Sequence, residues 1–169
     1  MSICWSLHLR REAASVPLAR RLFLGTMEAA GVDPEISYEL AVALSEACAN
    51  AVEHGTGEQS DAFEVSARIE GDICHIEVVD TGPGFPAEPV RSASRSVAIL
   101  PAPQADPRPG PPVLVPFSEA DHGRGLHLIE TLADHVLFAN RPDSGGAMVS
   151  FDRILKWRDP DRPALLRAG

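Results

Sequence analysis

The first residues of the chain alternate between apolar side chains and polar or small ones. The apolar set is Ile3, Trp5, Leu7 and Leu9. A period of two residues predicts a half-buried strand over 3–9. After residue 15 the apolar positions recur every three or four residues. This spacing predicts a helix that has Ser15 as a candidate N-cap and ends at Gly31.

The middle of the chain predicts a second helix and a hairpin. An Asp-Pro start signal opens a stretch over 33–55 whose interior contains no Gly or Pro, which favours a long helix. Two alternating stretches, 63–69 and 73–79, flank a Gly-Asp turn signal. Together they predict an antiparallel hairpin.

Residues 86–122 interrupt this pattern with a proline-rich insert. Seven prolines fall within 101–116, a density that leaves room only for short turns or edge pairing, near 97–100 and 113–115. A long loop inside a domain is typical of a lid or an insertion. The insert is therefore not treated as a domain boundary.

The core pattern resumes after the insert. Helical spacing from residue 126 to about 134 predicts a third helix, and a Gly-rich turn joins two further strands, 136–139 and 147–151. We therefore predict one domain over 1–155. Its fold class is an α/β sandwich in which a mostly antiparallel mixed sheet of about five strands carries helices on one face. Residues 156–169 are rich in proline and charge, which predicts a loosely held tail.

The charge balance narrows the class of partner. The 169-residue chain carries a net charge of −9 and no run of Lys or Arg, so direct binding to nucleic acid or an anionic membrane is not expected. No apolar stretch reaches the roughly 18 residues of a membrane helix, and no signal peptide is visible. Three cysteines without C-x-x-C spacing indicate reduced thiols, and we expect a cytoplasmic protein.

One face of the helix predicted over 33–55 carries candidate chemistry. Glu46, Asn50 and His54 are one turn apart and share this face, opposite a small and apolar side. A carboxylate there can accept a proton, and an amide oxygen can hold a hard metal ion. The alternative is a polar face that is simply solvated.

Two glycine-containing motifs add to this face. Asp80 ends the second strand of the hairpin and is followed by Gly82 and Gly84, so a carboxylate can accept a hydrogen bond from an amino group while the glycines leave room for a flat ring. Gly123 and Gly125 stand at the start of the third helix, where backbone N–H groups favour an anion such as phosphate. Taken singly, each motif also fits an ordinary turn.

The three motifs in this order resemble those of the Bergerat-fold (GHKL) ATPases, and within that group the bacterial anti-sigma-factor serine/threonine kinases, over residues 3–152. The resemblance implies a domain that binds ATP and Mg²⁺, with the 86–122 insert as its lid. It also implies that Glu46 is the general base for a substrate hydroxyl, that Asn50 binds Mg²⁺ and that His54 lies near the nucleotide.

The resemblance assigns the glycine motifs and a partner surface as well. Asp80 would bind the adenine amino group, with Gly82 and Gly84 shaping the pocket. The residues that would close on the phosphates are Gly123, Arg124, Gly125 and Leu126. Arg20 and Arg21 otherwise fit a solvated helix face, but in the family an arginine in this region touches both the sigma factor and its antagonist.

Several functions are compatible with these features. The first is an ATP-dependent serine/threonine protein kinase that phosphorylates a small anti-sigma-factor antagonist and regulates transcription by partner switching; Glu46 favours it, since pure binding needs no base. The second is a non-catalytic switch protein that sequesters a partner. The third is a sensor histidine kinase domain, which the lack of a preceding phospho-acceptor helix pair disfavours. Relatives often carry a threonine near the position of Ala147 that helps to bind adenine, and alanine cannot take over this role. The sequence does not decide whether the chain forms a homodimer.

Overall fold

The strands and helices follow one another in the order that the hydrophobic pattern predicts. The computed structural model describes residues 2–54, 61–82, 84, 113–114, 123–141 and 146–158. In chain order the elements are β1 (Ser2–Arg10), α1 (Ser15–Ala30), α2 (Pro34–His54), β2 (Ala62–Glu70), β3 (Ile73–Asp80), β4 (Val113–Leu114), α3 (Gly123–Leu132), β5 (His135–Asn140) and β6 (Ala147–Ile154).

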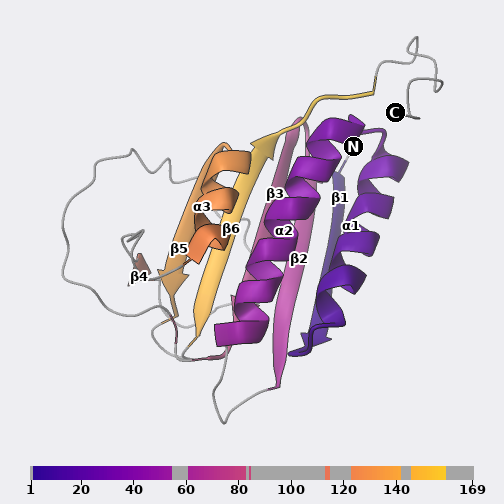
Figure 1. Ribbon diagram of the computed structural model, residues 1–169. Coiled ribbons are helices and arrows are strands. Elements are labelled where there is room, and N and C mark those ends of the chain that lie inside the picture. The colour runs from indigo at the N-terminus through magenta and orange to yellow at the C-terminus, as the bar shows by residue number, and fades with distance from the viewer. Residues whose placement is uncertain are drawn as a thin grey trace.

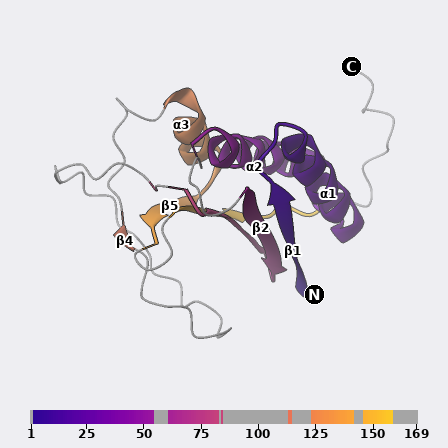
Figure 2. The same ribbon diagram turned by 90° about the horizontal axis from the view of Figure 1, so that it is seen from below.

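The strands form one sheet of order β1-β2-β3-β6-β5-β4, and all three helices lie on one face of it (Figure 1, Figure 2). This arrangement confirms the predicted α/β sandwich. Two details differ from the prediction. Each of the pairings is antiparallel, so the sheet is not mixed. A sixth strand, β4, comes from the insert and pairs with β5, in line with the edge pairing expected near 113–115.

Strand register places one alternating set of apolar residues from five strands on the helix-covered face, whereas Val79, Met148 and Ala139 form a register row on the open face. One row across the sheet runs Leu7, Val65, Val78, Val149 and Phe138. Four of these side chains are buried, and each buried aliphatic or aromatic side chain contributes about 1.5–3 kcal/mol relative to an exposed one. The period-two alternation read from the sequence is therefore the alternation between the core and the open face.

Helix α2 packs its small and apolar side onto the sheet, as its sequence predicts. The buried members of that side are Leu40, Ala41, Leu44, Ala47, Cys48 and Ala51. At the start of the helix, the Asp33 carboxylate accepts a hydrogen bond from the Glu35 N–H at 2.9 Å, which confirms the Asp-Pro start signal. The polar side of α2 is consequently turned away from the sheet.

Of the two predicted ends of α1, the first is wrong and the second is confirmed. The hydroxyl of Ser15 donates to the carbonyl of Arg10 instead of capping α1, whose N-cap position is Ala14 and has no side-chain cap. Gly31 does end α1, with a φ of 82° that suits glycine.

The C-terminal segment expected to be loose is held at its start. The Asp33 N–H donates to the Lys156 carbonyl, and the Trp157 indole N–H donates to the Asp72 carboxylate at 2.7 Å. Residues 156–158 therefore connect the loop between α1 and α2 to the turn between β2 and β3 through hydrogen bonds. Residues 159–169 lie outside the described residues.

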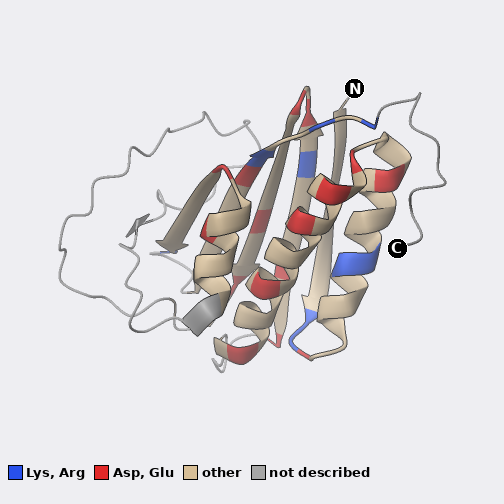
Figure 3. Ribbon diagram, turned by 45° about the horizontal axis from the view of Figure 1, so that its top comes forward, with Lys and Arg blue, Asp and Glu red and all other residues tan. Residues whose placement is uncertain are grey.

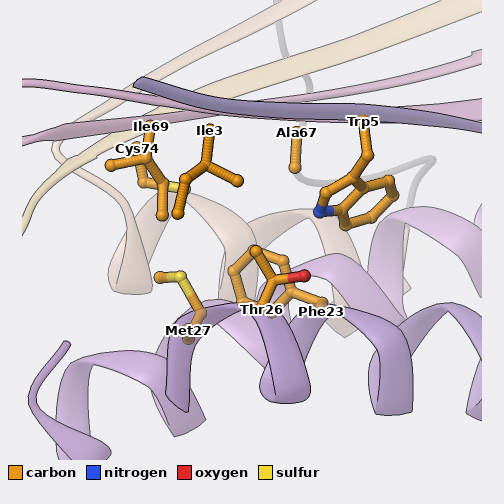
Figure 4. Close-up of a pocket in the computed structure, with 8 residues that line it drawn as sticks. All are labelled: Ile3, Trp5, Phe23, Thr26, Met27, Ala67, Ile69 and Cys74. Atoms are coloured by element: carbon orange, nitrogen blue, oxygen red, sulfur yellow. The ribbon is translucent and has the colours of Figure 1, made fainter. Parts of the chain in front are cut away.

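A small apolar hollow lies between α1 and the sheet (Figure 4). Its lining residues are Ile3, Trp5, Phe23, Thr26, Met27, Ala67, Ile69 and Cys74. None of the residues expected to bind nucleotide lines this hollow, which belongs to the packing between helix and sheet. Cys74 and Cys48 are both buried, whereas Cys4 is exposed on β1.

The three thiols are expected to differ sharply in reactivity. Burial raises the pKa of Cys48 to about 12, and burial together with the Asp152 carboxylate raises the pKa of Cys74 to about 12. The thiolate is the reactive form of cysteine. An aromatic disulfide reagent at about pH 8 should therefore label Cys4 quickly and the two buried thiols only after the protein unfolds. In Cys4→Ser the fast phase should vanish. A fast phase that persists in this variant would show that a buried thiol is accessible.

Candidate functional site

The polar face of α2 meets the start of α3 at a very short separation. Glu46 and Asn50 are half-buried on this face. A β-carbon on Gly125 would lie 2.6 Å from Oε2 of Glu46, so the carboxylate occupies the space that a side chain at Gly125 would fill. The first and third motifs, far apart in the sequence, are therefore in direct contact.

Packing of α3 explains this contact. The helix begins at Gly123, within the Gly-x-Gly motif itself, and buries Leu126 and Ile129 in the core beside α2. Its first turn consequently lies beside the C-terminal half of α2, at the same end of the sheet (Figure 1). Helix N-termini attract negative charge through unpaired N–H groups and the helix dipole. A carboxylate and the N-terminus of a helix thus share one location.

The second motif contributes a buried carboxylate. Asp80 is the last residue of β3 and only 5% exposed. Its Oδ1 accepts hydrogen bonds from the N–H of Gly82 at 2.8 Å and from the N–H of Ala147 at 3.1 Å. Both bonds within the described residues go to Oδ1, so Oδ2 retains its capacity to accept a hydrogen bond from a ligand.

Glycines close tightly around Asp80. A β-carbon on Gly146 would overlap the carbonyl oxygen of Asp80, and the φ of Gly146 is 97°. On the other side, a β-carbon on Gly84 would lie 2.6 Å from Oδ1 of Asn140. These glycines let the end of β3, the end of β5 and the start of β6 approach one another closely.

Sequence reasoning missed two residues here, Asn140 and Gly146. Asp80, Ala147 and Asn140 lie in register on neighbouring strands, because Asn140 pairs with Ala147 and Ala147 bonds to Asp80. The small Ala147 therefore stands between two polar side chains. The hydroxyl of Thr81 is also buried and has no hydrogen-bond partner among the residues that the structure describes. The sequence did mark both residues, because Asn140 and Gly146 flank the predicted hairpin turn. Only the strand register, however, reveals that they lie close to Asp80.

The remaining residues that the sequence predicts for the site do not all lie beside Glu46 and Asp80. His54 is the last residue of α2, and its side chain is 68% exposed and 3.9 Å from the Glu53 carboxylate. Gly123 and Arg124 belong to the first turn of α3, although the Arg124 side chain lies outside the described residues. Arg20 and Arg21 lie on α1, which α2 separates from α3 (Figure 1).

A second polar cluster lies on the open face of the sheet and is not part of this site. The His75 Nδ1 atom bonds to Asp152, and its Nε2 atom lies 3.4 Å from the Ser150 hydroxyl. This order of side chains is that of a hydrolytic triad. Ser150, however, lies in the middle of β6 and is only 7% exposed, which leaves a substrate carbonyl little access to its hydroxyl. The cluster therefore acts in cross-strand pairing.

The residues around Asp80 and Glu46 suit an adenine nucleotide. The Asp80 carboxylate offers an acceptor, and the Thr81 hydroxyl, which has no hydrogen-bond partner among the described residues, offers a donor. The first turn of α3 suits phosphates. No cluster of three or more acidic, His or Cys side chains occurs among the described residues, and Mg²⁺ in nucleotide sites typically needs few protein ligands.

Comparison with known proteins identifies the class. Residues 9–152 match the histidine kinase-like ATPase domain family, and the chain belongs to it. This match confirms the resemblance drawn from the three motifs. The coarse activity of the class, use of ATP by a Bergerat-type domain, follows from this membership.

A solved structure shows the same fold. The RsbU and RsbW domains of Rv1364c from Mycobacterium tuberculosis match with a TM-score of 0.61 and 17% sequence identity. The alignment covers 92% of this chain and 33% of that one, so this chain spans about a third of its length. No curated protein matches the sequence. None of the helices described is long and apolar enough to cross a lipid bilayer.

Proposed function

We propose that this protein is an ATP-dependent serine/threonine protein kinase of the anti-sigma-factor type, which phosphorylates a small antagonist protein and regulates transcription by partner switching. The observation that supports a catalytic role is the contact between Glu46 and Gly125. It brings a carboxylate to the helix end where the phosphates of a nucleotide would bind. A binding module that only sequesters a partner has no need of a proton acceptor there.

The roles proposed for individual residues are those that the family resemblance implies, and the chemistry of each side chain supports them. Glu46 accepts the proton of the substrate hydroxyl, and the Asn50 amide oxygen, one turn on, holds Mg²⁺. Asp80 accepts a hydrogen bond from the adenine amino group through Oδ2. The backbone of 123–126 donates to the phosphates. Bound Mg·ATP supplies the phosphoryl group and neutralises its charge, and the protein contributes positioning and the base.

The experiment that tests this proposal is capture followed by phosphotransfer. Tagged protein retains its partner from cells of its source, and the captured material is incubated with γ-labelled ATP and Mg²⁺. Labelling of one small captured protein on Ser or Thr supports the kinase. Stable capture with nucleotide binding but without labelling would support the alternative, a non-catalytic anti-sigma switch.

Charge reversal on α1 is expected to weaken partner capture. The Arg20 guanidinium lies 5.2 Å from the centroid of the Tyr38 ring, and Arg21 points to solvent. Arg20→Glu or Arg21→Glu should reduce the amount of antagonist retained while the nucleotide affinity stays at the wild-type value, because α2 separates both residues from Asp80 and α3. Pull-down and calorimetry of the same preparations provide the two readouts. If both variants capture the partner as well as the wild type does, the two arginines belong to a solvated helix face and do not contact the partner.

A further inference from the structure

Asp80 and Asn140 stand at the two ends of a short row across the sheet. Val79 pairs with Met148, so Asp80, the next residue, lies opposite Ala147, and Ala147 in turn pairs with Asn140. The hydrogen bond from the Ala147 N–H to Asp80, at 3.1 Å, agrees with this alignment. Alternation along the three strands puts all three side chains of the row on the helix-covered face.

The row provides a span that suits one flat ring. Strand β6 lies between β3 and β5, so Asp80 and Asn140 are about 10 Å apart, twice the spacing of neighbouring strands. Both ends carry short polar side chains, whereas Ala147 between them adds only a methyl group. Hydrogen bonds of about 2.9 Å at the two ends leave about 4 Å between them. That remainder is the distance from an exocyclic amino nitrogen to the atom on the opposite side of a six-membered ring.

The Asn140 side chain lies against the same glycine motif that contains Asp80. Asn140 is half-buried, and a β-carbon on Gly84 would lie 2.6 Å from its Oδ1 atom. The motif therefore reaches both ends of the row. An asparagine amide has two N–H donors beside its oxygen, so a contact within the protein leaves it capacity to donate to a ligand.

The charge around the row favours a neutral donor at this end. Figure 3 shows acidic residues and no Lys or Arg along α2, the helix that packs against β3 and β6. Asp80 adds a further carboxylate at the other end of the row. A nucleotide is itself an anion, and each further negative charge nearby repels it. The amide of Asn140 supplies a hydrogen-bond donor without adding such a charge.

We propose that Asn140 is a specificity-determining residue that reads the base of the nucleotide, a role that rests on the nucleotide binding proposed above. The ring lies over Ala147. Asp80 accepts a hydrogen bond from the 6-amino group of adenine, and the Nδ2 group of Asn140 donates to N3, the ring nitrogen opposite the carbon that bears the amino group.

The second hydrogen bond separates adenine from the other amino-bearing base of the common nucleotides. Cytosine also offers an exocyclic amino group to Asp80. The ring atom opposite its amino-bearing carbon, however, is the nitrogen bonded to ribose, which cannot accept a hydrogen bond. Asp80 alone therefore does not distinguish the two amino groups, whereas Asp80 and Asn140 together favour adenine.

Calorimetric titration of the full chain with pairs of nucleotides tests this role. The wild type should bind 3-deaza-ATP, in which a C–H group replaces N3, roughly 3- to 10-fold more weakly than ATP, as for the loss of one neutral hydrogen bond. Asn140→Ala should bind these two nucleotides equally, and its preference for ATP over CTP should fall by the same factor. His135→Ala, at the other end of β5, is the matched control and should keep both preferences. Each ratio compares two ligands on one protein, so a change in stability does not imitate the effect.

Asn140→Asp should reverse the preference. This variant keeps the size of the side chain but faces N3 with a second acceptor, so it should bind 3-deaza-ATP more tightly than ATP. Equal affinity of the wild type for ATP and 3-deaza-ATP overturns the inference, as does an N3 preference that survives in Asn140→Ala. Either result leaves ATP binding and the proposed kinase in place. Failure of the wild type to bind any of these nucleotides overturns both, and the expected preferences without phosphoryl transfer contradict the kinase alone.

Discussion

Glu46→Gln is expected to slow phosphoryl transfer to the captured antagonist by about 10²–10⁴-fold, the usual contribution of a general base. Nucleotide binding and partner capture should stay close to the wild-type values. The substitution keeps the size and shape of the side chain and removes only its ability to accept a proton. Rates of labelled γ-phosphate transfer, measured beside a nucleotide titration of the same preparation, provide the test.

The contact with Gly125 makes this variant informative. Glutamine can occupy the space beside Gly125 that the carboxylate occupies, so no rearrangement of α3 is required. Glu53→Gln, on the exposed end of the same helix, is the matched control and should transfer phosphate at the wild-type rate. Normal transfer by Glu46→Gln would show that another group is the base. Loss of nucleotide binding would make Glu46 a ligand-contacting residue instead.

Asp80→Asn is expected to weaken ATP binding roughly 10- to 150-fold while the protein stays folded, as for loss of a hydrogen bond to a charged group. The asparagine oxygen can still accept the two bonds from the N–H groups of Gly82 and Ala147. Its amide nitrogen then replaces Oδ2, so a hydrogen-bond donor faces the amino group of adenine. The substitution therefore separates ligand recognition from local structure.

Calorimetric titration with ATP and with ADP measures this effect, and thermal unfolding of the same sample monitors the fold. Asp61→Asn, at an exposed position before β2, should bind like the wild type. Wild-type affinity in Asp80→Asn would remove the carboxylate from the adenine pocket. Undetectable binding by the wild type itself at millimolar nucleotide would contradict the ATP-binding role.

The order of elements and the face of α2 could be predicted because both depend on local periodicity. Trp5 alternates with its neighbours, and Leu44 recurs at helical spacing with Cys48, whatever the rest of the chain does. The Ser15 prediction failed because a hydroxyl near a helix start has more than one acceptor within reach. Here the Arg10 carbonyl, 2.7 Å away, accepts the hydrogen bond from the Ser15 hydroxyl.

The candidate site was less accessible to sequence reasoning because its contacts are long-range. No local pattern states that Gly125 lies against Glu46, or that the start of β6 brings the Ala147 N–H to Asp80. Asn140, at the end of β5, also lies against Gly84, a proximity that the position of neither residue in the sequence reveals. The individual roles in nucleotide binding stay predictions that the mutants above test.

The strand order of the sheet has a consequence for how the chain folds. Strand β6 lies between β3 and β5, yet it is the last of the strands along the chain. Even the contact between β3 and β6 with the shortest separation, Asp80 to Ala147, spans 67 positions in sequence, so a large loop must close before the sheet is continuous. Until then the three-stranded part β1–β2–β3 presents the bare edge of β3. Unpaired edges of this kind can recruit other chains, so we expect misassembly during refolding to begin at β3.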